Sequence, residues 1–372
     1  MLLPSAPWPR DAGAKIRNAG LLRLLREEHA VDVLTFGDAH RVCPGAEVVA
    51  APDRSKARRL GDMIRSQLPD MAQRLWSAEF AAKVRNRGYD AVQAEGIEMA
   101  RYLAYTPSDR RVYDAHNAEF LLQQRLAESG SIQARLYSRL QWRRLERFER
   151  AVVRGSRLTL TVSAHDANQL LALSGGEANV RVLPNAIDAA SYAFQAPSVE
   201  AQPNFLFVGK LDFRPNAEAL AWFIPEVLQR LNQARLFAVG AAPPDWLVRA
   251  GQHDQGIAVT GYVADERPYF ARCAALVLPV RAGGGSRLKA LVAMASGLPI
   301  VATRIGMEGL EAEAGTHFLQ AEAPQEWIEA LRNLVSDAAL RKRLACAART
   351  LVVERYDWST LRETLRAAYA WL

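Results

Sequence analysis

The 372-residue sequence predicts an α/β protein made of two doubly wound domains. Short apolar runs typical of buried parallel strands alternate with helical segments along the whole chain. The length exceeds what one hydrophobic core usually supports, and the polar, proline-containing stretch Gln195–Pro203 interrupts the alternation near the midpoint. Because doubly wound sheets bind ligands at the carboxyl ends of their strands, we expect the two domains to face one another across a cleft.

In the first half of the chain, each predicted strand is an apolar run and is followed by a segment with helical periodicity. The expected strands are Val31–Phe36, Tyr89–Glu95, Arg111–His116 and Leu158–Ser163. The expected helices are Ile16–Glu28, Asp62–Arg87, Glu119–Ser129 and Ala164–Leu173. This order predicts an N-terminal domain over residues 1–186.

The second half repeats the alternation after a linker that begins near Val182–Asp188. Its expected strands are Asn204–Gly209, Ala234–Gly240, Ile257–Val263, Ala275–Val280 and Leu298–Thr303, and its expected helices are Asn216–Leu231, Pro268–Cys273, Ser286–Ser296 and Pro324–Val335. We expect a C-terminal domain over residues 187–354. The last helical segment, within 355–372, lies beyond the last expected strand and should complete the N-terminal domain.

The composition indicates a folded globular protein, with 50% hydrophobic and 23% charged residues. No apolar run approaches the roughly 20 residues that a membrane span needs. The start, MLLPSAPWPR, is too short and too rich in proline for a signal peptide. The three cysteines are widely spaced and the six histidines have no ligand spacing, so we expect a cytoplasmic protein without a metal site.

A glycine-rich segment predicts a phosphate-binding turn in the second domain. Gly283, Gly284 and Gly285 follow an apolar strand and allow a sharp turn and close approach of a ligand. Ser286 is expected to cap the next helix, so its free N–H groups and positive dipole end would face the ligand. Arg287 and Lys289 in the first turn would oppose that dipole unless an anion is bound. The alternative is a surface turn with two solvated cations.

Much of the net charge of +7 comes from Arg135–Arg157, which holds eight arginines and two glutamates. Apolar residues recur through it at roughly helical spacing: Leu136, Leu140, Trp142, Leu145, Phe148 and Val152. A core-facing helix with a solvated arginine face explains this pattern. The functional alternative is docking on an anionic membrane surface. We do not expect nucleic acid as a partner, because no aromatic platform or helix-turn-helix pattern accompanies the charge.

A set of motifs, in this order and spacing, resembles the retaining glycosyltransferases of family four, which have the GT-B fold of two Rossmann-like domains. The motifs are PWPRDAGAKIRNAGLLRLL, VYDAHN, LTVSAHDANQL, VLPNAID, FVGKLDFRPNAEALAWF, VTGYVADERPYFARC and GGGSRLKALVAMASGLPIVAT. The versions FVGKLDFRPN and GGGSRLK are similar to a branch that acts on bacterial envelope and exopolysaccharide sugars. The resemblance implies a nucleotide-sugar donor, UDP- or GDP-linked, transfer with retention, and neither a cofactor nor a required metal.

The resemblance also implies roles for individual residues. Lys210 stands where the family usually has a phosphate-binding arginine, and with Arg287 and Lys289 it would clamp the leaving diphosphate. His116 matches the histidine that contacts the donor sugar, although a histidine at a strand end is often structural. The remaining residues expected at the donor are Gly13, Ala14, Val263 and Val292.

Two departures from the family pattern concern the donor site. Pro215 stands where a second phosphate-binding lysine is usual. Gly284 and Val292 stand where the family has two glutamates, the second of which binds the ribose. We expect Val292 to line the donor cleft rather than the core, with Glu308 or Glu311 as substitute ribose acceptors.

Together these observations predict a cytoplasmic, membrane-peripheral glycosyltransferase acting on a glycan, lipid-linked or small-molecule acceptor. The first domain would bind the acceptor and the second the donor. Val292 leaves open a non-catalytic partner protein of the same fold in envelope-glycan assembly. A sugar-nucleotide epimerase is the weaker alternative, because no pair of carboxylates suited to proton abstraction is evident.

Overall fold

The computed structural model describes residues 1–8, 13–37, 45–128, 132–195, 202–282 and 287–372. The chain forms two compact units. Unit 1 comprises Met1–Pro184 and Arg362–Leu372, and unit 2 comprises Asn185–Leu361. The predicted domain boundary, after residue 186, lies two residues beyond the observed one at Pro184. The C-terminal segment that joins unit 1 was predicted to begin at residue 355 and begins at Arg362 in the structure. Each unit contains one parallel sheet with helices packed on it, which confirms the α/β class and the two doubly wound domains.

The sheet of unit 1 has seven strands in the order β3-β2-β1-β4-β5-β6-β7, and every paired neighbour is parallel. The strands are β1 Leu2–Leu3, β2 Val33–Phe36, β3 Ala46–Val49, β4 Val92–Glu95, β5 Arg111–Ala115, β6 Leu158–Thr161 and β7 Val180–Val182. The order reverses direction between β1 and β4, and the carboxyl ends of strands at such a reversal are where doubly wound sheets bind ligands.

The helices of unit 1 cover both faces of this sheet. They are α1 Gly13–Leu25, α2 Lys56–Arg65, α3 Asp70–Arg74, α4 Ala78–Arg85, α5 Ile97–Ala100, α6 Glu119–Leu126, α7 Ile132–Gly155 and α8 Ala164–Ser174. The single helix predicted over Asp62–Arg87 is wrong, because the structure has α2, α3 and α4 in this region. Pro69 explains the first of the two interruptions: it precedes α3 in an extended conformation and cannot continue a helix.

Alternating strand residues divide the core of unit 1 between the two faces. On one face, Ala94 and Tyr113 pack with Leu145 and Val153 of α7 and Leu170 of α8. On the other, Leu3 and Val33 pack with Leu22 of α1. Because the strands are buried on both sides, their sequences are nearly continuous apolar runs, which is why pattern alone identifies them.

The sheet of unit 2 has six strands in the order β10-β9-β8-β11-β12-β13, again all parallel and with a reversal between β8 and β11. The strands are β8 Asn204–Val208, β9 Arg235–Val239, β10 Ile257–Gly261, β11 Ala275–Leu278, β12 Ile300–Ala302 and β13 Leu319–Gln320. The helices are α9 Arg214–Glu226, α10 Asp245–His253, α11 Arg267–Arg272, α12 Leu288–Ser296, α13 Pro324–Ser336 and α14 Ala338–Arg355.

A single large cluster forms the core on one face of the second sheet. Phe205 and Phe207 of β8 pack with Phe223 of α9 and with Trp327 and Leu331 of α13. Phe223 meets Trp327 edge to face, with 5.5 Å between ring centroids. This packing holds β8, and therefore the turn that follows it, on a rigid base.

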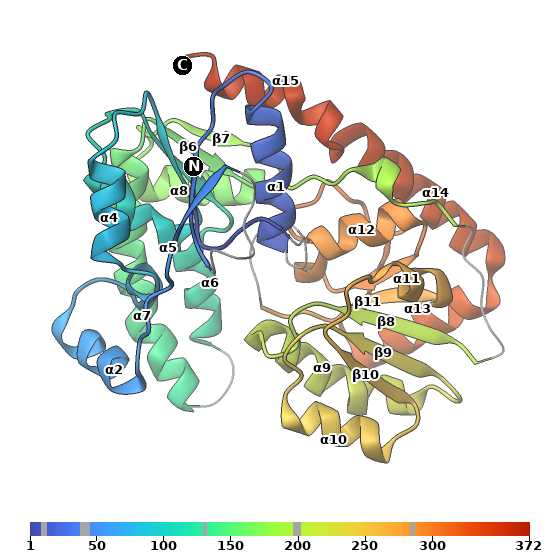
Figure 1. The fold of residues 1–372 in the computed structure, drawn as a ribbon. Coiled ribbons are helices and arrows are strands. Elements are labelled where there is room, and N and C mark those ends of the chain that lie inside the picture. The colour runs from blue at the N-terminus through green and yellow to red at the C-terminus, as the bar shows by residue number, and fades with distance from the viewer. Residues whose placement is uncertain (9–12, 38–44, 129–131, 196–201, 283–286) are drawn as a thin grey trace. The chain divides into compact units, whose positions relative to one another are not determined.

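Helix α15 (Trp358–Tyr369) carries the chain back to unit 1, which Arg362–Leu372 join. Arg366 forms an ion pair with Glu28 beyond the end of α1, and Arg181 donates to the carbonyl of Ala367 at 2.8 Å. The Tyr369 hydroxyl donates to Gln93 of β4. These contacts fix the end of the chain on the first sheet (Figure 1).

Candidate functional site

In each unit, the point where the strand order reverses gathers several of the residues singled out by sequence. In unit 1, α1 follows β1, Glu95 ends β4, and His116 follows β5. In unit 2, Lys210 follows β8, and Arg287 and Lys289 lie between β11 and β12. Ligands of doubly wound sheets bind at this position.

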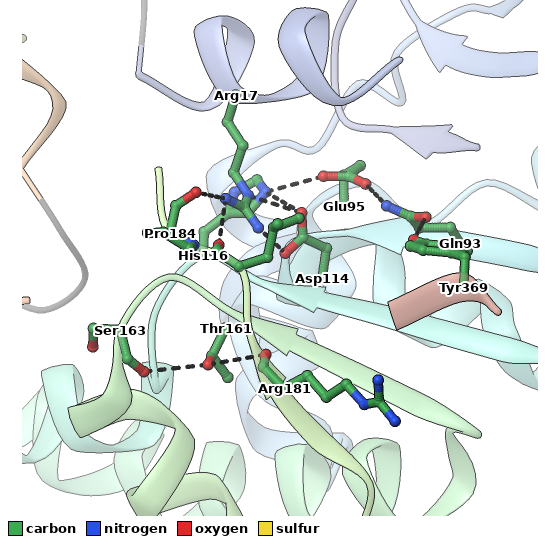
Figure 2. A network of polar contacts seen from close by, with 11 residues as sticks. Arg17, Gln93, Glu95, Asp114, His116, Thr161, Ser163, Arg181, Pro184 and Tyr369 are labelled. Carbon is green, nitrogen blue, oxygen red and sulfur yellow. Dashed lines mark hydrogen bonds and ion pairs between the residues drawn. The ribbon is translucent and has the colours of Figure 1, made fainter. Parts of the chain in front are cut away.

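A buried ion pair forms the base of the site in unit 1. Arg17 of α1 donates to both carboxylate oxygens of Asp114, at 2.8 and 2.7 Å, and neither side chain is more than 1% exposed. The same guanidinium donates to the carbonyls of Leu183 (3.0 Å) and Pro184 (3.2 Å) (Figure 2). Arg17 therefore ties β5 to the last residues of unit 1 before the chain enters unit 2.

His116 lies beside a second buried carboxylate. Its Nε2 is 3.2 Å from Oε2 of Glu95, which is fully buried, whereas the histidine side chain keeps 19% of its surface exposed (Figure 2). Glu95 also accepts from Gln93 Nε2 at 2.5 Å. With its amide oriented so that nitrogen faces acceptors, Asn18 donates to Glu95 Oε2 at 2.9 Å and to the carbonyl of Ala14 at 3.0 Å.

The charges in this cluster shift one another's protonation. Burial alone would raise the pKa of Asp114, but Arg17 holds it below the usual value. Burial and repulsion from Asp114 raise the pKa of Glu95 to about 7. Burial alone would lower the pKa of His116, but its hydrogen bond to Glu95 and the charge of Asp114 raise it. The contacts with Glu95 and Asp114 therefore favour the protonated form of His116.

Glu95, Asp114 and His116 also form the one group in the described part of the chain whose ligand atoms could surround a metal ion, all lying within 4.8 Å of one another. Arg17 occupies both oxygens of Asp114, and three donors face Glu95. A cation would have to displace the guanidinium, so these residues fit a hydrogen-bonded network better than a metal centre.

The segment after His116 is held by two further carboxylates. Asp166 accepts from the Ala118 amide at 3.0 Å. Glu149 of α7 accepts from the amides of Glu119 and Phe120, at 3.3 and 3.0 Å, at the start of α6. Burial raises the pKa of Glu149 to about 8. The sequence analysis did not identify these residues, which secure the backbone on the carboxyl side of His116.

In unit 2, Lys289 reaches the turn after β8. Its Nζ donates to Asn216 Oδ1 at 3.1 Å, and Asn216 Nδ2 donates to the carbonyl of Lys210 at 2.8 Å. A side chain on Gly209 would lie 3.1 Å from Nζ, and one on Gly240 would collide with the Gly209 carbonyl. Both glycines have positive φ angles, 144° and 148°, so the turn depends on residues without a side chain.

Lys289 is only weakly stabilised as a cation by its protein surroundings. Burial, and then repulsion from Arg287, lower its pKa to about 7, while Glu266 attracts the charge from a distance. Its hydrogen-bond partner Asn216 is neutral. An anion bound beside Nζ would restore the charge, because an opposite charge favours the ionised form.

The structure corrects the predicted start of the following helix. α12 begins at Leu288, and Arg287, with φ −92° and ψ 92°, is its N-cap residue instead of a residue of the first turn. Arg287 donates to the carbonyl of Ile305 at 3.3 Å. Ser286, which was expected to be the cap, lies with Gly283, Gly284 and Gly285 outside the described residues.

The other predicted residues lie in varied surroundings. The Lys210 side chain is 66% exposed and pairs with Asp212 at 3.3 Å. Val263 is half-buried beyond the end of β10, and Gly13 is the first residue of α1. Val292 was expected to line the cleft rather than the core, but it is buried, with 7% exposed. α12 is apolar almost all round, and such a helix is buried on every side.

Two models of known families match the chain. One, described as Glycosyltransferase Family 4, matches residues 13–191, and the other, Glycosyl transferases group 1, matches residues 202–337. The fold and these matches define the class: the protein has the GT-B fold. The chain belongs to the family-four type of glycosyltransferases.

Three similar proteins illustrate the range of relatives. Glycogen synthase of Mycobacterium tuberculosis is 29% identical over 238 residues, which is 61% of this chain and 57% of that protein's length. Sucrose-phosphate synthase from Thermosynechococcus elongatus aligns over 100% of this chain and 98% of its own, with a TM-score of 0.77 and 17% identity. Anabaena HepE, solved with UDP and glucose, covers 100% of this chain and 99% of its own, with a TM-score of 0.71 and 17% identity.

A cavity of about 470 Å³ in unit 1 lies away from these residues. Val33, Val92 and Arg110 line it at the amino ends of the strands, together with Tyr369. His116 and Glu95 lie at the opposite, carboxyl edge of the same sheet. The cavity is therefore not part of the candidate site.

Proposed function

We propose that the protein is a retaining, metal-independent glycosyltransferase that moves a sugar from a nucleoside-diphosphate donor to a glycan, lipid-linked or small-molecule acceptor. The observation that carries the proposal is the position of Lys289. Its Nζ lies over the glycine turn after β8, where the sheet order reverses, and its hydrogen-bond partner is a neutral amide. This arrangement suits a diphosphate, and the relative HepE was solved with UDP and glucose.

Chemically, the departing nucleoside diphosphate gains negative charge as the bond to the sugar breaks. Lys289 and Arg287, held by α12 and its N-cap, would stabilise that charge, and the exposed Lys210 would add a third cation. The reaction as proposed needs no cofactor and no metal, because protein cations supply the stabilisation. His116 would contact the sugar.

Calorimetric titration with UDP, GDP, dTDP and ADP tests the donor site. We expect one of these nucleotides to bind, and Lys289→Met to weaken its binding by about tenfold or more, since a charge-assisted hydrogen bond contributes roughly 1.5–3 kcal/mol. Lys342→Met, which removes an exposed lysine of α14 in the same unit, is the matched control and should bind as wild type. Equal affinities in all three proteins would remove Lys289 from the site.

A second candidate function, a non-catalytic partner protein in glycan assembly, is favoured by Val292. This buried valine offers no acceptor to a ribose hydroxyl at the position where the family has a glutamate. The same titration separates the two candidates. If none of the four nucleotides binds to the folded protein, the partner function is preferred and the transferase is excluded.

We also propose that the protein docks peripherally on an anionic membrane through α7 and α2. The sequence favoured a helix with all its leucines towards the core, but Ile132, Leu136 and Leu140 are 81%, 66% and 43% exposed. The buried side of α7 instead carries Ser138, Gln141, Leu145, Glu149 and Val153. Leu60 and Ile64 of α2 are also exposed, at 59% and 77%.

The exposed leucines share the surface of α7 with cations. Arg139, Arg143 and Arg147 recur every fourth residue and are all exposed, so they form a stripe beside Leu136 and Leu140. Arg144 donates to the carbonyl of Met63 at 2.8 Å, which keeps α2 against this helix. Exposed apolar side chains next to arginines are the features of an interfacial membrane surface. No helix among the described residues is long and apolar enough to cross a bilayer.

Sedimentation with liposomes tests the docking. Wild type should bind vesicles containing phosphatidylglycerol, less strongly at high salt, because exposed charges are screened over about 8 Å at physiological ionic strength. The triple change of Arg139, Arg143 and Arg147 to Gln should release it while leaving nucleotide binding intact. Equal binding to neutral vesicles, or no binding to either kind, would mean that α7 is a solvated surface helix with no role in membrane docking.

A further inference from the structure

The carboxylate of Glu95 is the centre of a buried hydrogen-bond network in unit 1. Its Oε1 accepts from Gln93 Nε2 at 2.5 Å, and its Oε2 lies 3.2 Å from His116 Nε2 and 2.9 Å from the amide nitrogen of Asn18. When Glu95 is ionised it can only accept hydrogen bonds, so the histidine then carries a hydrogen on Nε2. Glu95 therefore determines which ring nitrogen faces the protein.

The other ring nitrogen, Nδ1, is left for a ligand. No described residue forms a hydrogen bond with it, and the side chain is 19% exposed. Nδ1 lies near Gly96, where a Cβ would be in van der Waals contact with it at 3.6 Å. Gly96 also has a φ of 77°, a backbone conformation that residues other than glycine seldom adopt.

The charges that face His116 come from four elements. Glu95 ends β4, Asp114 lies on β5, Arg17 on α1 and Glu119 at the start of α6, and Tyr369 of α15 approaches the same cluster. With Glu95, Asp114 and the guanidinium ionised, an imidazolium balances their charges, while burial raises the pKa of Glu119 to about 7. Because an uncompensated buried charge is costly, the ionised carboxylates favour a proton on His116.

A second layer holds Glu95 itself. The Tyr369 hydroxyl donates to Gln93 Oε1, which turns the nitrogen of the Gln93 amide towards Glu95 (Figure 2). Both Gln93 and Tyr369 are buried, with 6% of each exposed. The tyrosine lies 276 residues away in sequence, on the helix that returns to unit 1. Helix α15 is therefore linked to His116 through a chain of hydrogen bonds that runs from Tyr369 through Gln93 and Glu95.

We propose that Glu95 is a positioning residue for His116, which holds the imidazolium by Nε2 and presents Nδ1–H to an oxygen of the sugar substrate, and that Tyr369 and Gln93 hold Glu95 in place. This inference rests on the proposed transferase function for the identity of the ligand. The network itself stands on the contacts within unit 1.

Two measurements on the whole chain test the proposal. The first is NMR titration of the His116 ring, assigned by the loss of its signal in His116→Gln. Glu95→Gln should lower the pKa of His116 by at least about one unit, as expected when a carboxylate in contact is neutralised. Tyr369→Phe should shift it in the same direction by less, and Tyr262→Phe, at an exposed position in unit 2, should not shift it.

The second measurement is transfer kinetics. The alkaline limb of the kcat profile should move to lower pH in Glu95→Gln by the same amount, so that kcat above this limb falls about tenfold per unit, with the donor KM unchanged. A residue with a merely structural role would alter the melting temperature without moving this limb. An unchanged histidine pKa in folded Glu95→Gln would overturn the proposal, and if that variant does not fold, the shift in Tyr369→Phe decides. If wild type transfers no sugar, the transferase proposal fails, whereas the titration still decides on the network.

Discussion

The two units differ in how charged side chains are paired at equivalent positions of their sheets. In unit 1, the charges at the reversal point are matched within the protein: Arg17 with Asp114, and His116 with Glu95. In unit 2, Lys289 faces a neutral amide and the pKa of its amine is lowered to about 7. In the first site these ionisable groups contact a partner of opposite charge, whereas Lys289 in the second forms no ion pair with a described residue.

This difference indicates that the two sites have different roles. A network held by ion pairs and hydrogen bonds within the protein is rigid, and rigidity suits groups that must hold a substrate in one orientation. A cation that burial and a like charge destabilise gains most when an anion arrives. The comparison therefore predicts that changes in unit 1 alter stability and orientation, whereas changes in unit 2 alter the binding and departure of the diphosphate.

The largest effect should come from breaking the buried ion pair of unit 1. Asp114→Asn leaves the Arg17 guanidinium without its charged partner, and removing one member of a buried pair typically costs about 3–5 kcal/mol. Hydrogen exchange of backbone amides measures this loss of stability separately in each unit. The amides of β4 and β5 should lose protection by this amount, while those of β8 and β9 in unit 2 serve as the internal control.

A double variant sharpens that result. Arg17→Met with Asp114→Leu removes both charges and restores apolar volume, so much of the lost protection should return. Protection in Asp114→Asn equal to that of wild type would mean that the buried pair does not stabilise unit 1, and the comparison between the units would fail.

In unit 2, removal of a clamp cation should leave the fold intact and slow the reaction. Arg287→Ala should lower turnover by about 10²–10³-fold, comparable to the loss of one preorganised donor at a developing negative charge. The measurement is steady-state transfer by the purified, folded variant. Arg281→Ala, which removes an arginine that stacks on Trp222, is the control for lost charge in the same unit. Unchanged turnover in Arg287→Ala would exclude the residue from the clamp.

Nucleotide affinity should depend on pH through Lys289. Its lowered pKa means that the free protein loses the charge above about pH 7, whereas a bound diphosphate favours the protonated amine. Binding then takes up a proton, and the affinity should fall as pH rises, by up to about tenfold per unit. Calorimetry between about pH 7.5 and 9.5 avoids the phosphate's own ionisation near 6. Lys289→Met should show weak, pH-independent binding, and a flat profile in wild type would contradict the linkage.

The contrast between central and edge strands explains how much of the fold the sequence predicts. The strands that were missed include three of the four edge strands, β3, β7 and β13, and the two-residue β1, whereas the edge strand β10 was predicted. An edge strand is only partly covered, so it needs no continuous apolar run: β7 has no fully buried residue. Central strands are buried on both faces and therefore have a continuous apolar run. All central strands longer than two residues were predicted.

The same reasoning applies to the site. His116 and Lys289 stand in recognisable motifs, so pattern and resemblance identify them without knowledge of their contacts. Glu95, Arg17 and Asn216 were missed because their importance comes from partners distant in sequence, as with Arg17 and Asp114, which are 97 residues apart. Glu95 offered one usable signal, since a carboxylate at the end of a predicted central strand lies where doubly wound sheets bind ligands.

The smallest effect should come from an ion pair of unit 1 that lies in water. Arg362 of α15 pairs with Glu27 at 3.3 Å, and the two side chains are 45% and 37% exposed. Solvent and salt screen such a pair, and exposed pairs typically contribute about 0.2–1 kcal/mol. Arg362→Gln should therefore reduce the protection of α1 and α15 amides by no more than this, at low salt, and by less at high salt. A loss as large as that in Asp114→Asn would show that burial is not what separates the two pairs, and that the attachment of α15, instead of the buried network, determines the stability of unit 1.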